Sequence, residues 1–191
     1  MSSQPVGYIS QEEYLERERL AETKHEYFDG EMVDMAGGSP THSLITANVA
    51  RALGNRLEQS PCKAFSSDLR VCVRWGKLIT YPDVTVACPP LDYLDDRRDT
   101  IVNPRLVVEV LSPSTRNYDR GEKLRTFRMA PSIEEYLLIE QTPVEIEHGR
   151  RMANGHWDVE TILDGTAIIE LAAIGCQLPV SEIYKGLDIL L

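Results

Sequence analysis

The chain has 191 residues, of which 42% are hydrophobic and 26% are charged, and its formal net charge is −10. This length suits one domain with a substantial core, so we predict a single domain over residues 1–191. The acidic balance argues against a protein that simply coats nucleic acid, because non-specific affinity comes mainly from neutralised phosphates. Charge is uneven, however, since residues 116–128 hold five basic residues against two acidic ones.

The first residues lack the basic-then-apolar pattern of a signal peptide, and no stretch approaches the roughly 18 apolar residues of a membrane span. The cysteines are scattered without a Cys-x-x-Cys pair, and we expect reduced core residues rather than a metal site or a disulfide framework. They are Cys62, Cys72, Cys88 and Cys176. These features predict a cytoplasmic protein without a membrane segment.

The N-terminal region predicts a helix followed by a hairpin. Ser10 and Glu13 form a capping box for a helix that continues to about Ala21. Residues 27–35 then read as strand, turn and strand around Asp29-Gly30.

The middle of the chain changes from helical to strand periodicity. Apolar residues recur at helical spacing between residues 44 and 57, and Ser39 or Thr41 can cap this helix. Alternation over residues 69–75 predicts a strand with one buried face. The other short strand-like runs are residues 63–66, 78–80 and 83–87.

The second half opens with the aliphatic run Leu106–Leu111, typical of a strand buried on both faces. A helix over residues 117–129 follows. Strand-like runs then occupy residues 136–140, 144–147 and 157–163, with hairpin turns predicted at Asn154-Gly155 and Asp164-Gly165 and a short helix near Ser181. The predicted fold class is α/β, a mixed β-sheet flanked by helices with additional C-terminal β-hairpins.

Asp83 and Glu109 are acids in apolar strand-like runs, a costly placement unless they are paired, hydrogen-bonded or bound to a metal. Adjacent strands lie about 4.8 Å apart, so both carboxylates could contact one ion. Mg²⁺ commonly takes one or two carboxylates, waters and substrate phosphate. The alternative is that Asp83 caps a turn and Glu109 pairs with a core arginine.

Lys123 lies about two turns into the predicted helix after Glu109, so a helix that folds back over the sheet would return its ammonium group near that carboxylate. Arg116, Arg120 and Lys123 are spaced to share one helix face, which could contact phosphates. The alternative is a solvated basic face with an Asp119–Lys123 pair.

Glu26 is a candidate for an auxiliary carboxylate, whereas His42, near a helix start, is expected to be a cap or packing residue rather than a base. Ser112 and Ser114 have no identifiable histidine partner for nucleophilic catalysis. Gly37-Gly38 is not followed by the Gly-Lys-Ser/Thr of a phosphate-binding loop.

Several of these stretches together resemble the Uma-two family of restriction-type endonucleases, within the PD-(D/E)XK nuclease superfamily. The resemblance spans about residues 8–185. Its motifs are Lys24-His25-Glu26-Tyr27, Asp29-Gly30-Glu31, His42, Tyr81-Pro82-Asp83-Val84, residues 109–115, Asp119-Arg120-Gly121-Glu122-Lys123 and Glu135-Tyr136.

The resemblance implies a restriction-endonuclease-like mixed sheet with Asp83 and Glu109 as metal-binding acids. Leu111 stands where the wider superfamily has a strand lysine, and Lys123 matches the position to which that role is proposed to have moved. We therefore expect a Mg²⁺-dependent endonuclease acting on DNA, with Mn²⁺ as a substitute and the Val110 carbonyl completing the metal shell. Cleavage of two strands suits a homodimer.

The rival expectation is a catalytically inactive module that binds nucleic acid or protein on the same fold. The missing strand lysine at Leu111 and the net charge of −10 motivate it.

Overall fold

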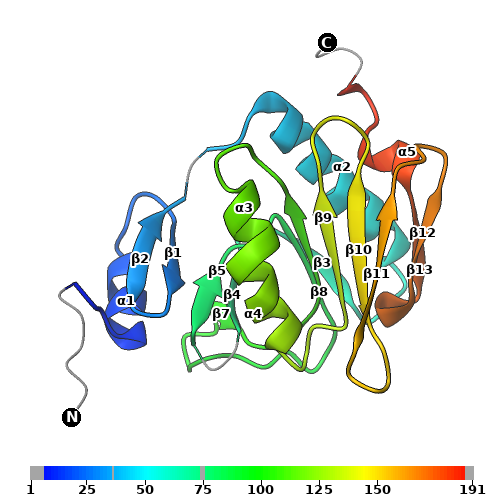
Figure 1. The fold of residues 1–191 in the computed structure, drawn as a ribbon. Helices are drawn as coiled ribbons and strands as arrows, with labels where there is room; N and C mark the ends of the chain where they lie inside the picture. The colour runs from blue at the N-terminus through cyan, green and yellow to red at the C-terminus, as the bar shows by residue number, and fades with distance from the viewer. Residues whose placement is uncertain (1–6, 36, 74–75, 188–191) are drawn as a thin grey trace.

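The computed structural model describes residues 7–35, 37–73 and 76–187, which form two larger β-sheets, a two-stranded sheet and helices packed around them (Figure 1). The six-stranded sheet has the order β11-β10-β9-β8-β6-β3. Its strands are β3 (Lys63–Ser66), β6 (Val84–Ala87), β8 (Pro104–Val110), β9 (Glu135–Ile139), β10 (Ile146–Arg151) and β11 (Trp157–Ile162).

Within this sheet β8 and β9 are parallel, whereas the other neighbouring pairs are antiparallel. A parallel pair requires a crossover connection. Here the crossover is helical and consists of α3 (Arg116–Tyr118), a π-helical turn (Asp119–Lys123) and α4 (Leu124–Met129).

The five-stranded sheet has the order β2-β1-β5-β4-β7. Its strands are β1 (His25–Phe28), β2 (Glu31–Asp34), β4 (Arg70–Val73), β5 (Leu78–Thr80) and β7 (Thr100–Ile101). The two-stranded sheet pairs β12 (Ile168–Leu171) with β13 (Cys176–Pro179). The remaining helices are α1 (Gln11–Glu18), α2 (Pro40–Arg56), the 3₁₀ turn Ala172–Ile174 and α5 (Val180–Ile183).

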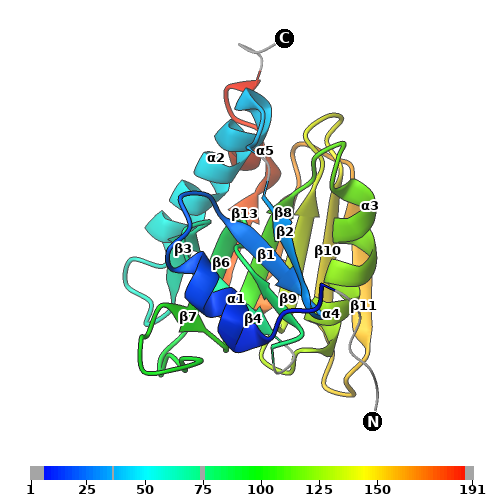
Figure 2. The ribbon, with the colours of Figure 1, turned by 90° about the vertical axis from the view of Figure 1, so that its left-hand side faces the viewer.

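Two hydrophobic clusters cover opposite faces of the six-stranded sheet, and Figure 2 shows α2 and the α3–α4 crossover on opposite sides of it. On one face, Ile45 and Leu53 of α2 pack with Val108 of β8. On the other face, Leu124 and Phe127 of α4 pack with residues of β4, β5 and β8. The predicted α/β fold with a mixed sheet flanked by helices is confirmed, although the strands divide between two larger sheets.

The predicted helix and hairpin starts agree with the backbone. The Ser10 hydroxyl accepts a hydrogen bond from the Glu13 N–H at 3.1 Å, which is one half of the predicted capping box, while the Glu13 carboxylate pairs with Arg17. Asp29 and Gly30 have φ values of 48° and 100°, which suit the β1–β2 turn. Ser39, rather than Thr41, caps α2.

Two strand predictions are wrong. The first assigned one buried face to residues 69–75, but all four residues of β4 are buried. Val71 and Val73 face the six-stranded sheet, while Cys72 packs in a separate cluster with α1, so the strand is covered on both sides. Arg74 and Trp75, which belonged to that prediction, lie outside the described residues.

The second wrong prediction is the hairpin at Asp164-Gly165. Asp164 does form a turn, since its carboxylate accepts a hydrogen bond from the Thr166 N–H at 2.8 Å. The strands on either side, β11 and β12, belong to different sheets. Asn154-Gly155 does join the β10–β11 hairpin, and β12 and β13 form the other C-terminal hairpin through the 3₁₀ turn.

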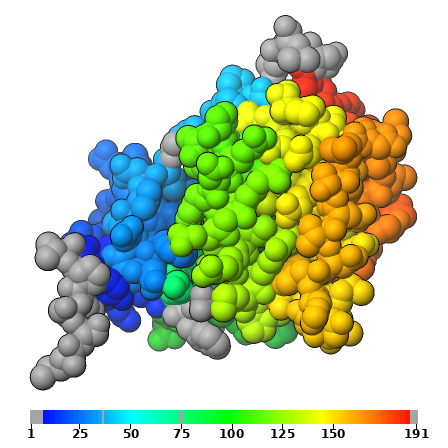
Figure 3. Space-filling view, in the orientation of Figure 1, coloured from blue at the N-terminus to red at the C-terminus, as the bar shows by residue number. Residues whose placement is uncertain are grey.

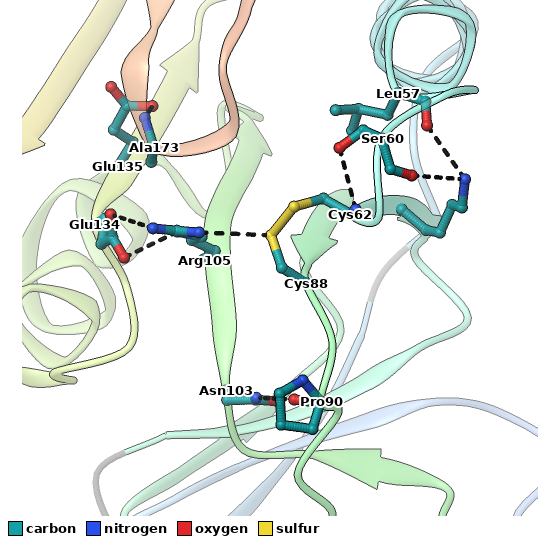
Figure 4. The surroundings of a disulfide bond; sticks show 11 residues. Leu57, Ser60, Cys62, Cys88, Pro90, Asn103, Arg105, Glu134, Glu135 and Ala173 are labelled. Carbon is teal, nitrogen blue, oxygen red and sulfur yellow. Dashed lines mark hydrogen bonds and ion pairs between the residues drawn. A yellow bond between two sulfur atoms is a disulfide. The ribbon is translucent and has the colours of Figure 1, made fainter.

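The expectation of reduced cysteines is wrong for one pair, because Cys62 and Cys88 form a disulfide (Figure 4). The antiparallel register of β3 and β6 pairs Lys63 with Ala87, so the next residues outward face each other across the strands. Cys72 and Cys176 are free, as predicted. Within the described ranges, no helix combines the length and apolar character that crossing a membrane requires.

Candidate active site

Glu109 lies on β8, and Asp83 immediately precedes the neighbouring strand β6. The register of β6 and β8 pairs Val84 with Val108, which places Asp83 across from Glu109. Asp83 lies just before β6, where its carboxylate Oδ2 accepts a hydrogen bond from the Val110 N–H at 2.7 Å. The predicted adjacency of the two acids is therefore confirmed, and the β8 backbone holds the Asp83 carboxylate in place.

Glu109 faces the helical crossover. Side chains alternate between the faces of a strand. Leu106 and Val108 belong to the cluster beneath α2, whereas Val107 and Leu111 belong to the cluster beneath α4. Glu109 shares the second face and is 6% exposed.

Lys123 reaches Glu109 from the last residue of the π-helical turn. Its ammonium Nζ lies 2.9 Å from Glu109 Oε1 and 3.1 Å from Glu26 Oε2. Asp119, on the same turn, lies 3.7 Å from Nζ. The predicted return of the lysine to Glu109 is confirmed, and Lys123 is 4% exposed. Figure 3 shows the green helical segment that carries it lying at the surface between the N-terminal hairpin and β9–β10.

The predicted common face of Arg116, Arg120 and Lys123 is wrong. The arginines contact Glu140, whereas Lys123 contacts Glu109. A π-helical turn holds more residues than an α-helical turn, so it rotates Lys123 away from the arginines. Spacings of four and three residues indicate one face only in a regular α-helix.

The two arginines belong to a separate ion-pair network beside β9 and β10. Arg116 and Arg120 lie 2.6 Å and 2.9 Å from Glu140, and Arg120 also lies 2.8 Å from Glu145. We call this set the arginine–glutamate network; its members are Arg116, Arg120, Arg128, Glu140, Glu145 and Glu147. Contact of its arginines with phosphate stays a prediction.

Glu26 enters the site from β1. The Thr80 hydroxyl donates to Glu26 Oε2 at 2.6 Å, and the Tyr118 hydroxyl donates to Oε1. Burial opposes ionisation of Glu26, but the Lys123 ammonium and these hydroxyl donors outweigh it and lower the pKa of the carboxyl. Glu26 is thus a fixed, ionised carboxylate.

Negative charge is in excess around Lys123. We call the four acids and the lysine the acid–lysine cluster; its members are Glu26, Asp83, Glu109, Asp119 and Lys123. Burial raises the pKa of Glu109 well above its usual value, and the nearby Asp83 and Asp119 add to the rise. Burial opposes the charge on Lys123, yet Glu109, Glu26 and Asp119 raise the pKa of its ammonium well above normal. One ammonium therefore faces three carboxyl groups, and a fourth, that of Asp83, lies near Glu109.

His42 is a member of the site that the sequence did not assign to it. Its Nε2 lies 3.2 Å from Asp83 Oδ2, and its side chain is 18% exposed. The hydrogen bond to Asp83 raises the pKa of His42, with burial opposing and the Val110 backbone adding to the rise. Its position near a helix start predicted a cap or a packing residue. The cap prediction is wrong, because Ser39 caps α2 and its Oγ accepts the His42 N–H. No local sequence pattern predicted that the His42 ring would contact Asp83, which lies 41 positions further along the chain.

The oxygen donors at this site are of the type that a small divalent cation prefers. The Glu109 carboxylate is buried, and its Oε1 lies 2.9 Å from the Lys123 ammonium. Among the described residues no three His, Cys, Asp or Glu side chains form a ready metal shell. Mg²⁺ does not require one, because it is usually held by one or two carboxylates with waters and substrate phosphate. Asp83, Glu109 and the Val110 carbonyl are the groups that would hold it.

Two proteins of Synechocystis sp. are similar to this chain over most of its length. An uncharacterized protein of Synechocystis sp. is 41% identical over 189 residues, covering 97% of this chain and 96% of that protein. A second uncharacterized protein of the same organism is 32% identical over 160 residues, covering 84% of this chain and 90% of that protein.

A crystal structure from Anabaena variabilis, described as a "putative nuclease belonging to DUF820", superposes with a TM-score of 0.74 at 18% identity. The match covers 92% of this chain and 97% of that chain, and it shows a shared fold. The Uma2 family model, described as "Putative restriction endonuclease", matches residues 11–181. The chain therefore belongs to the Uma2 family of restriction-endonuclease-like proteins.

Proposed function

We propose that this protein is a Mg²⁺-dependent endonuclease that hydrolyses phosphodiester bonds of DNA. The observation that carries the proposal is the Lys123 ammonium lying 2.9 Å from Glu109, next to the strand that Asp83 precedes. A buried lysine returned to two strand-borne acids supplies the residue types that metal-dependent phosphodiester hydrolysis uses.

Each residue has a distinct part in the proposed reaction. Asp83, Glu109 and the Val110 carbonyl hold the cation. Mg²⁺, when bound, supplies polarisation of the scissile phosphate and a more acidic water. Lys123 orients the attacking water and stabilises negative charge on the phosphoryl oxygens. Glu26, held by Thr80 and Tyr118, keeps the lysine charged and serves as the auxiliary carboxylate.

Substrate, assembly and compartment belong to the same proposal. The substrate is DNA, contacted at its phosphates by Arg116 and Arg120 when these leave part of their pairing with Glu140. A homodimer would present two sites to the two strands. The cytoplasm is the proposed location.

Cleavage of supercoiled plasmid and of single-stranded DNA, with Mg²⁺ or Mn²⁺, tests the proposal. We expect cleavage by the wild type, and a loss of at least about 100-fold in Asp83→Ala and Lys123→Met. Lys77→Met is the matched control, because Lys77 pairs with Asp29 away from the cluster and should retain full activity. Chelation with EDTA should abolish cleavage.

The rival function is the catalytically inactive module, favoured by Leu111 in place of a strand lysine. It predicts that the protein binds DNA or another protein, and that neither plasmid nor single-stranded DNA is cleaved in the presence of a metal ion. Unchanged cleavage in Asp83→Ala would instead reject the site assignment while leaving a nuclease.

A further inference from the structure

His42 touches two of the groups assigned to the metal. Its Nε2 lies 3.2 Å from Asp83 Oδ2, the same oxygen that accepts the Val110 N–H at 2.7 Å. The ring also contacts the Val110 backbone. Oδ2 of Asp83 therefore has two donors, while among the described residues no donor reaches Oδ1. This asymmetry leaves one carboxylate oxygen free to face a cation.

The ring is held from behind by the loop that leads into α2. An added Cβ at Gly38 would meet His42 Nδ1 at 2.7 Å, so only glycine leaves room for the ring at this place. The neighbouring Gly37 has open space, since nothing lies within 4 Å of its added Cβ. Gly37-Gly38 lacks the sequence pattern of a phosphate-binding loop. Within this pair, Gly38 packs against the His42 ring and Gly37 does not.

The same loop is anchored to the end of β8. Ser39 Oγ accepts the His42 N–H at 3.1 Å and donates to Gln141 Oε1 at 2.7 Å. Gln141 in turn donates to the Leu111 carbonyl at 2.8 Å. The start of α2 is thereby fixed to the chain immediately after Glu109 and Val110, which fixes the distance from the ring to Asp83.

We infer that His42 is a positioning residue for the metal site: it holds Asp83 Oδ2 against β8 so that Oδ1 faces the cation, and Gly38 makes room for the ring. The inference rests on the proposed function, because it needs Asp83 as a ligand. Groups that orient metal-binding side chains typically change metal affinity by about 10- to 100-fold when removed. His42 acts through Asp83 and touches no reacting atom.

Binding of Mn²⁺ alone, measured from the free-ion signal in electron paramagnetic resonance, tests this without DNA. We expect Asp83→Asn to lose the site and His42→Ala to raise the dissociation constant at least about 10-fold. His42→Gln, which keeps a donor at a similar reach, should recover part of the affinity. Gly38→Ala should weaken binding in the same direction by displacing the ring, whereas the matched Gly37→Ala should bind as the wild type does.

Thermal unfolding of each variant distinguishes loss of the metal site from loss of the fold. If His42→Ala does not fold, the Mn²⁺ affinity of Gly38→Ala decides the question. Wild-type affinity in His42→Ala and Gly38→Ala, with affinity lost in Asp83→Asn, would overturn the positioning role and leave the proposed function standing. Wild-type affinity in Asp83→Asn, or no Mn²⁺ binding by the wild type, would overturn both.

Discussion

The acid–lysine cluster and the arginine–glutamate network lie on two sides of one helical crossover, and they differ in the balance of positive and negative groups. The network balances three arginines against three glutamates, and its arginines are partly exposed. The cluster places one buried ammonium beside three carboxyl groups, with a fourth, that of Asp83, near Glu109. Balanced pairs suffice to fix a helix on a sheet. In the proposed function, the carboxyl groups of the cluster serve to hold a cation.

The largest effect should come from removing the only ammonium of the cluster. Lys123→Met leaves Glu26, Glu109 and Asp119 without their common partner. Removing one member of a buried ion pair costs about 3–5 kcal/mol. Urea unfolding at pH 7 should show this loss, while Lys77→Met should cost less than about 1 kcal/mol as a surface pair. A loss below about 1 kcal/mol in Lys123→Met would mean that the acids are not ionised together.

Glu140, in the arginine–glutamate network, should contribute more to the free energy of unfolding than Glu109 in the acid–lysine cluster. Glu140 is buried and accepts hydrogen bonds from Arg116 and Arg120. Glu140→Gln should therefore lower the free energy of unfolding by about 2 kcal/mol, as hydrogen bonds to charged groups typically contribute. Equal stability of Glu140→Gln and wild type would show that the network does not stabilise the fold through Glu140.

Glu109→Gln is the same substitution in the cluster and should have the opposite sign. It puts a neutral group in place of a carboxyl whose charged form is opposed by burial and by the nearby Asp83 and Asp119. The free energy of unfolding should stay equal or rise by up to about 1 kcal/mol, while Mg²⁺-dependent cleavage is lost. A destabilisation of about 2 kcal/mol would show that Glu109 serves the fold as Glu140 does.

Raising the salt concentration should reduce the stability contribution of the arginine–glutamate network more than that of the acid–lysine cluster. Exposed charges are screened over about 10 Å at 0.1 M ionic strength, whereas buried pairs are screened much less. Raising NaCl from about 0.05 to 0.5 M should shrink the stability difference between wild type and Glu140→Gln, because Arg116 and Arg120 are partly exposed. The difference between wild type and Lys123→Met should remain.

The smallest stability effect should belong to Arg116→Ala, since the Arg116 side chain is 48% exposed. We expect a loss below about 1 kcal/mol. If Arg116 contacts phosphate, the slope of log affinity for DNA against log salt should also fall by about 1. An unchanged slope, measured by fluorescence anisotropy with a labelled duplex, would confine Arg116 to its contact with Glu140.

Features set by neighbouring residues were predictable from the sequence. The aliphatic run around Glu109 indicated a strand buried on both faces, and its length with the following helix placed Lys123 near that acid. The capping box at Ser10 and the turn at Asp29-Gly30 follow from local hydrogen bonding and backbone preference.

Features set by which distant segments meet were not predictable. The Cys62–Cys88 disulfide depends on the register of β3 and β6, which no cysteine spacing encodes. Asp164-Gly165 specifies a turn but not the sheet to which the next strand belongs. The contact of His42 with Asp83 depends on where α2 docks, so the helix-start position alone indicated only a cap.

The π-helical turn between Asp119 and Lys123 makes the crossover sensitive to its exact number of residues. Such a turn accommodates one residue more than an α-helical turn. Gly121 lies within it, and nothing lies within 4 Å of a Cβ added there. Deletion of this one residue would restore α-helical geometry. That change turns the residues before it by about 100° relative to Lys123. Arg116 and Arg120 could then keep Glu140, or Lys123 could keep Glu109, but not both, so the π-helical turn lets one short helix contact both acids.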